Sequence, residues 1–116
     1  MPLTPREATR LERRLVATLT DACETAKAEI PGFEWLTHTV DYATFPQSLR
    51  VIWVFDTRAS KDQALAAGTD QRLRELTGIA LAAAEAGAVR LDRCVRVDSE
   101  EECRLQHGGD WRVRLG

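Results

Sequence analysis

Cys103 and His107 are the residues whose types and spacing most directly suggest chemistry. They are four residues apart, so on a helix their side chains share one face. A thiolate and an imidazole could supply half of a zinc site, or a nucleophile and its base. The three glutamates before Cys103 oppose thiolate formation. We therefore favour a structural interpretation, in which Cys103 is a small buried residue and His107 closes a helix that Gly108 ends.

The second histidine, His38, lies in the segment PGFEWLTHTVDY. Glu34, Asp41 and Tyr42 are close enough in sequence to form a hydrogen-bonded cluster with it. We expect a histidine on a strand whose hydrogen bonds are satisfied. The catalytic alternative pairs His38 with one of the two carboxylates as acid and base. One hypothesis for the function is therefore a small enzyme or metal-binding protein that uses His38 or the Cys103/His107 pair.

Arginine side chains provide the other hypothesis. Arginine binds phosphates and carboxylates through a planar fork of donors. One group shares a sheet face if the last two predicted strands pair, and a second group lies on the first predicted helix: Arg90, Arg96, Arg112 and Arg114, then Arg10, Arg13 and Arg14. The alternative is a solvated surface that neighbouring acids neutralise. The arginines favour a non-enzymatic binding or regulatory protein with a protein or nucleic-acid partner.

Composition limits the classes of function. The 116 residues fit a single domain over 1–116, and the net charge of −2 excludes a general attraction to nucleic acid or anionic lipid. The three cysteines are an odd number without a CxxC motif, which favours reduced thiols. The chain shows no signal peptide, membrane-spanning run or glycine-rich phosphate loop. We expect a cytoplasmic protein without cofactor or membrane partner, and the six Trp and Phe side chains allow a homodimer.

Patterning predicts an α+β domain. A capping box at Thr4 begins a helix, and Pro31-Gly32 ends it. Two strands follow, of which LRVIWVFDT is apolar on both faces and so should be central. Two helices, a strand from Val89 to Val97, a helix capped by Asp98 or Ser99, and a last strand from Trp111 complete the order α-β-β-α-α-β-α-β. We expect a mostly antiparallel sheet with helices packed on one face.

Three segments together resemble a small proteobacterial family often labelled Fis family transcriptional regulators: PGFEWLTHTVDY, FPQSLRVIWVFDT and VDSEEECRLQHGGDW. The resemblance covers most of the chain after the first helix, and the label implies a regulatory role. The chain has no Fis-type helix-turn-helix, so no DNA contacts follow. The element order of residues 5–97 is also similar to KH-type domains and the ribosome-binding factor A family. At residues 67–70, AGTD stands where a KH domain has GxxG.

Overall fold

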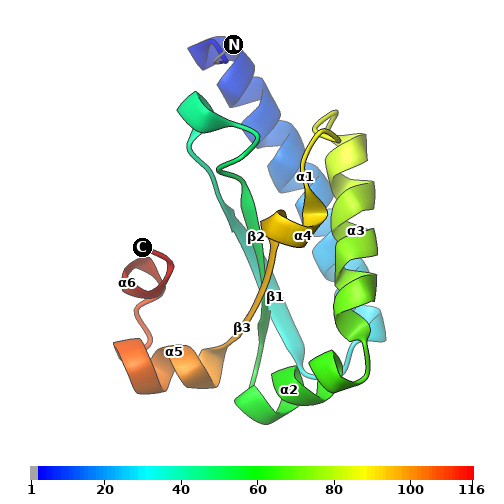
Figure 1. The fold of residues 1–116 in the computed structure, drawn as a ribbon, viewed down its shortest axis with the longest axis vertical. Coiled ribbons are helices and arrows are strands. Elements are labelled where there is room, and N and C mark those ends of the chain that lie inside the picture. Colours follow the sequence, from blue (N-terminus) through cyan, green and yellow to red (C-terminus); the bar gives the residue numbers. More distant parts are fainter. Residues whose placement is uncertain (1–2) are drawn as a thin grey trace.

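The computed structural model describes residues 3–116 and has the predicted α+β fold (Figure 1). Among the described residues, no helix has both the length and the apolar character that a membrane crossing requires. The elements, in chain order, are α1 (Pro5–Glu29), β1 (Phe33–Thr39), the 3-10 turn η1 (Tyr42–Thr44), β2 (Arg50–Phe55), α2 (Arg58–Ala66), α3 (Thr69–Ala83), α4 (Leu91–Cys94), β3 (Val95–Ser99), α5 (Glu100–His107) and α6 (Trp111–Leu115).

Helix α1 is confirmed, together with its capping box. The Thr4 hydroxyl accepts a hydrogen bond from the Glu7 N–H at 3.1 Å, and the Glu7 carboxylate accepts one from the Thr4 N–H at 2.9 Å. The apolar residues recur at helical spacing, so they form one buried stripe. That stripe packs α1 against α3 and β1, and its buried members are Leu11, Leu15, Leu19, Ala22 and Ala26.

The three-stranded sheet has the order β1-β2-β3, with β2 in the centre as predicted. Strands β1 and β2 pair antiparallel, whereas β2 and β3 pair parallel. The sheet is therefore mixed rather than mostly antiparallel. The reason is the connection, because α2 and α3 carry the chain from the end of β2 back to the end at which β2 began. Consequently β2 and β3 begin at the same end of the sheet.

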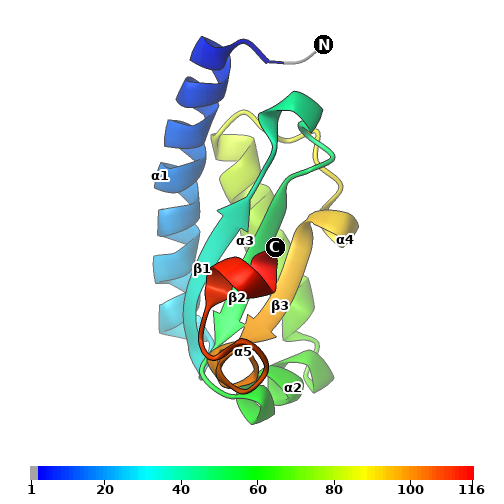
Figure 2. The same ribbon diagram turned by 90° about the vertical axis from the view of Figure 1, so that its left-hand side faces the viewer.

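Helices cover both faces of the sheet, rather than the single face that was expected (Figures 1 and 2). On the first face, α1 and α3 enclose the main core, where the fully buried Trp53 donates its indole N–H to the Thr77 hydroxyl at 3.1 Å. The second face carries α6, whose Trp111 packs against Trp35 of β1. Strand β2 is buried on both faces because each face has its own cover.

The last segment is a helix, and the prediction of a strand from Trp111 was wrong. The Asp110 carboxylate accepts hydrogen bonds from the N–H groups of Arg112 and Val113, which caps a helical turn. In a helix, Trp111 and Leu115 share one face and Val113 lies elsewhere, which agrees with Val113 being 61% exposed. Five residues are too few to distinguish a period of two from one of 3.6.

The predicted third strand was also too long at its start. Residues Leu91–Cys94 form the single turn α4, and β3 begins only at Val95. Leu91 and Cys94 are three residues apart, so one helical turn carries both. The Leu91 side chain reaches the surface of α3 at Gly78. In the sequence, Arg93 stands where the alternation of the predicted strand requires an apolar residue, and this break in the pattern falls within the turn.

Candidate functional site

The strongest candidate site is a pocket at the end of the sheet where β2 and β3 begin. Its volume is about 360 Å³, and none of the residues that line it is acidic. The loop before β2 forms one wall, and α4 with the residues before it forms the other. We call it the arginine pocket, and its principal lining residues are Leu49, Arg50, Val89, Arg90, Arg93 and Cys94.

Each arginine of this pocket has a different local setting. Arg50 begins β2 and donates from Nη1 to the carbonyl oxygens of Gln47 at 2.6 Å and Leu49 at 2.9 Å. These bonds hold the guanidinium without neutralising it. Arg90 is the N-cap residue of α4 and meets Asp92 only through an exposed contact of 3.5 Å. Arg93 follows Arg90 by three residues, so the α4 turn carries both to the pocket.

Arg96 extends the positive charge along β3. It is exposed, and like Arg50 and Arg93 it forms no ion pair with any residue in the range 3–116. Burial raises the pKa of the Cys94 thiol, although Arg50 and Arg96 oppose that rise through their charges. Cys94 therefore stays protonated and lines the pocket as a small apolar group. We call Arg50, Arg90, Arg93 and Arg96 the arginine cluster.

Of the four arginines predicted to share a sheet face, Arg90 and Arg96 belong to the cluster, whereas Arg112 and Arg114 do not. The prediction required a strand from Trp111, and that segment is α6. Arg114 is 14% exposed and binds the Asp98 carboxylate through two bonds of 2.6 and 2.8 Å. These hydrogen bonds raise the pKa of Arg114 and hold α6 on the sheet. Arg112 is 97% exposed.

The helix-1 arginines lie apart from the cluster. Arg10 and Arg13 are exposed on α1, and Arg14 donates from Nε to the Ala84 carbonyl at 3.0 Å. Figure 2 shows α1 beside the β1 edge of the sheet and α4 beside the β3 edge. The seven predicted arginines therefore divide among three places: the cluster, helix α6 and helix α1.

Cys103 and His107 lie on α5, as predicted, but no third ligand joins them. Cys103 is fully buried, and burial raises the pKa of its thiol. The Nδ1 atom of His107 accepts a hydrogen bond from Arg114 Nη1 at 3.2 Å. Within residues 3–116, no three His, Cys, Asp or Glu side chains are arranged to hold a metal. Gly108 ends α5 in the left-handed conformation at a φ of 60°.

His38 has a partner that sequence reasoning missed. Its Nε2 lies 2.7 and 2.9 Å from the two carboxylate oxygens of Glu12, and the Tyr42 hydroxyl donates to the same carboxylate at 3.3 Å. Burial, followed by the Glu12 charge, raises the pKa of Tyr42 to about 12. The predicted partners Glu34 and Asp41 make no such bond to His38. This hydrogen-bonded group of His38, Glu12 and Tyr42 joins α1 to the sheet. In the sequence, only the position of Glu12 on the face of the first helix could have indicated the contact.

A second concavity lies between the outer face of β1 and α6. Its volume is about 570 Å³, and its principal lining residues are Trp35, Thr37, Thr39, Trp111, Arg112 and Leu115. We call it the sheet groove. Ser48 also lines this groove, and its neighbours Gln47 and Leu49 line the arginine pocket. The two concavities therefore adjoin across the short segment before β2.

Comparison of the chain with protein-family models, curated proteins and solved structures found no match. The resemblances to the proteobacterial family and to KH-type domains therefore remain predictions.

Proposed function

We propose that the protein is a non-enzymatic, cytoplasmic binding protein whose arginine cluster takes the phosphate groups of a nucleic acid. The observation that carries the proposal is the cluster itself. Arg50, Arg90 and Arg93 line a pocket that no acidic residue lines, and Arg96 extends the positive charge along β3, in a chain with a net charge of −2. Such a local excess of positive charge is available to an external anion.

The arrangement of the cluster favours a repeating anion. Arg90, Arg93 and Arg96 recur every three residues along one continuous segment that passes from α4 into β3. A row of separate guanidinium groups can contact successive phosphates, each through a planar fork of donors. An acidic protein surface is the alternative partner. Homodimerisation also remains a prediction, which sedimentation velocity would test.

Fluorescence anisotropy of a labelled single-stranded oligonucleotide of about 12 nucleotides tests this function. The test variant combines Arg93→Ala with Arg96→Ala. The control variant combines Arg10→Ala with Arg13→Ala, which removes the same charge from the exposed face of α1. We expect the cluster variant to bind roughly tenfold more weakly or worse, and the control to change by less than about twofold.

Two outcomes would contradict the proposal. If both double variants lose the same affinity, binding depends on net charge and the cluster has no special role. If the wild-type protein ignores the oligonucleotide but binds a labelled poly-glutamate peptide through Arg93 and Arg96, the partner is an acidic protein. Circular dichroism of each variant confirms that it keeps the helical content of the native fold.

A further inference from the structure

The sheet groove contains an aromatic pair that is ordered without any ligand. The rings of Trp35 and Trp111 have centroids 5.0 Å apart and planes at 83°. One carboxylate, that of Glu100, accepts the indole N–H of Trp35 at 2.5 Å and that of Trp111 at 3.3 Å. Because both indole N–H groups are already bonded, the pair presents carbon surface rather than polar atoms to the groove.

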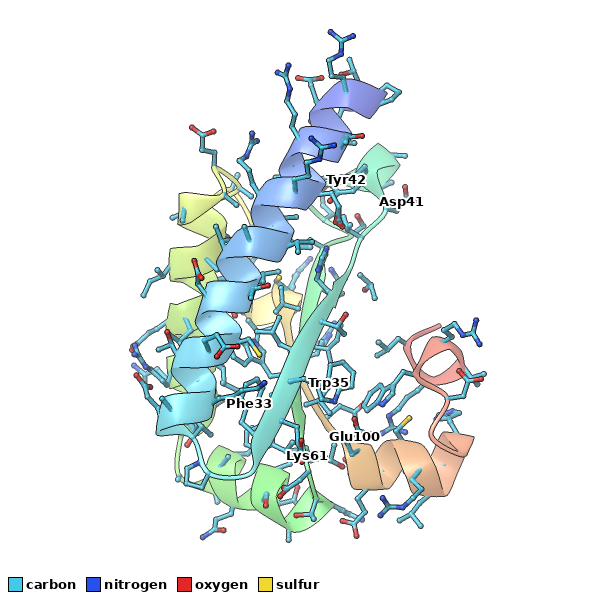
Figure 3. The ribbon with its side chains drawn as sticks, turned by 180° about the vertical axis from the view of Figure 1, so that it is seen from behind. Phe33, Trp35, Asp41, Tyr42, Lys61 and Glu100 are labelled. Atoms are coloured by element: carbon cyan, nitrogen blue, oxygen red, sulfur yellow. The ribbon has the colours of Figure 1, made fainter. Side chains whose placement is uncertain are left out.

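An irregularity in β1 places Trp35 in this groove. The register with β2 shifts between Phe33 and Trp35, so two residues that would share a face in a regular strand lie on opposite faces. Phe33 packs into the core against Trp53, whereas Trp35 meets α6. Figure 3 shows Phe33 pointing toward α1 and Trp35 pointing toward α6. A regular strand would have buried one of the two rings on the wrong side.

Hydroxyl groups line the same groove beside the aromatic pair. Thr37 and Thr39 alternate with Leu36 and His38 along β1, so their side chains follow Trp35 on the groove face. Neither threonine hydroxyl bonds to another side chain or carbonyl in the described part of the chain. A hydroxyl both donates and accepts, so this wall suits a flat ring with donors and acceptors at its edge.

The groove continues into the arginine cluster. Thr39 pairs with Arg50 across β1 and β2, and Ile52 pairs with Arg96 across β2 and β3. Paired residues project from the same face, so Arg50 and Arg96 begin on the face that carries the groove. Arg112, which is almost fully exposed, lies on the rim of the groove. An aromatic surface is thus next to a positively charged site that can bind anionic groups.

From this continuity we infer that the sheet groove holds an unpaired base of the nucleic acid whose phosphates the arginine cluster binds. The inference rests on the proposed function and adds that the nucleic acid is single-stranded. Bases in a duplex are stacked inside the helix, whereas an unpaired base can stack on an aromatic ring and bond through its edge. The Trp35/Trp111 pair supplies the ring surface, and Thr37 and Thr39 supply the edge contacts.

Three labelled probes of equal length test the inference: a single-stranded oligonucleotide, the same strand with abasic sites, and the matching duplex. We expect the single strand with bases to bind roughly tenfold more tightly than the abasic strand. Its binding should also change the emission of Trp35 and Trp111, because the third tryptophan, Trp53, is fully buried. Thr37→Val keeps the side-chain shape without the hydroxyl, and Trp111→Ala removes half of the aromatic pair.

Both variants should weaken binding of the strand with bases, by roughly tenfold for Trp111→Ala, and change binding of the abasic strand by less than about twofold. Leu105→Ala is the control, since Leu105 is 75% exposed on α5 outside the groove. Equal affinity for the base-containing and abasic strands, or an unchanged affinity in Thr37→Val and Trp111→Ala, would overturn the inference. Neither result touches the proposed function, which fails if no strand binds or if the Arg93/Arg96 variant binds the oligonucleotide no more weakly than the Arg10/Arg13 control.

Discussion

Ser99 is a fully buried polar residue at the junction of β3 and α5. Its hydroxyl accepts the Glu102 N–H at 3.1 Å and donates to the Glu102 carboxylate at 2.8 Å. Ser99→Ala removes the cap and leaves a buried N–H without a partner. We expect a loss of about 1–2 kcal/mol in the free energy of unfolding, measured by urea denaturation.

Thr9→Ala is the control for the Ser99 variant. The Thr9 hydroxyl bonds only to the Pro5 carbonyl on an exposed part of α1, so its removal should change the free energy of unfolding by less than about 0.5 kcal/mol. Equal losses in the two variants would show that Ser99 is not a special cap.

Glu102 makes the stability of the protein depend on acid. Burial would raise its pKa, but hydrogen bonds from Lys61 at 2.7 Å and from Ser99 outweigh that effect and hold the pKa below the ordinary value of 4.5. A carboxylate whose pKa is lower in the folded state stabilises the fold above pH 4.5, and its contribution is lost as the pH falls toward the folded pKa.

We therefore expect Glu102→Gln to lower the free energy of unfolding by about 1–2 kcal/mol at neutral pH and to flatten its decline in acid. Urea denaturation at several pH values measures both effects. Glu24→Gln is the matched control, because Glu24 lies exposed on α1 and pairs with no cation in the described residues. The account of Glu102 fails if both variants keep the acid dependence of the wild type.

At the scale of elements, an ion pair between Arg114 and Asp98 helps to hold α6 on the sheet, together with the contact of Trp111 with Trp35. Arg114 and Asp98, both less than a fifth exposed, fix the helix to β3. Arg114→Gln should release α6, so that its backbone amides exchange with deuterium roughly tenfold faster while those of β2 do not change. The measurement is hydrogen exchange followed by mass spectrometry.

Arg112→Gln provides the control for α6, because it makes the same substitution on the same helix at a side chain that is 97% exposed. It should leave the exchange of α6 unchanged. If both variants accelerate exchange equally, helix propensity rather than the Asp98 contact holds α6.

The elements that sequence predicted well are those whose signals are local. The Thr4 and Ser99 caps, the Gly108 stop and the apolar stripe of α1 depend on residues within a few positions of each other, and all are confirmed. Strand β2 was placed in the centre from its two apolar faces. The parallel pairing of β3 and the docking of α6 depend on contacts between distant residues, which a single sequence does not contain.

The candidate site was predicted only in part for the same reason. Arg90 and Arg96 were singled out, but on the assumption of a fourth strand. Arg50 and Arg93 were missed, since the first begins a strand that reads as core and the second interrupts an alternation. The Trp35/Trp111 pair was missed because α6 reads as a strand. The types of these residues can be read from the sequence, but it did not show which of them lie close together in the fold.

At the scale of the whole molecule, charge is unevenly distributed despite the net value of −2. The parallel strands β2 and β3 both begin beside the arginine cluster and both end near α2 and α5 (Figure 1). The first turn of α5 carries Glu100, Glu101 and Glu102. One end of the sheet is therefore basic and the other acidic, so a polyanion should approach from the α4 end.

This polarity predicts how strongly salt weakens binding to a single-stranded oligonucleotide. Each phosphate neutralised on a single strand contributes about −0.7 to the slope of log affinity against log salt, so four arginines give a slope of about −3. Removing Arg93 and Arg96 should roughly halve that slope, because two of the four contacts are lost. Removing Arg10 and Arg13 should leave it unchanged, since α1 lies at the opposite edge of the sheet from α4 (Figure 2). Anisotropy titrations over a series of potassium chloride concentrations give the three slopes. A slope that falls equally in both variants would mean that the strand responds to total charge, and the division of the molecule into a basic and an acidic end would not govern binding.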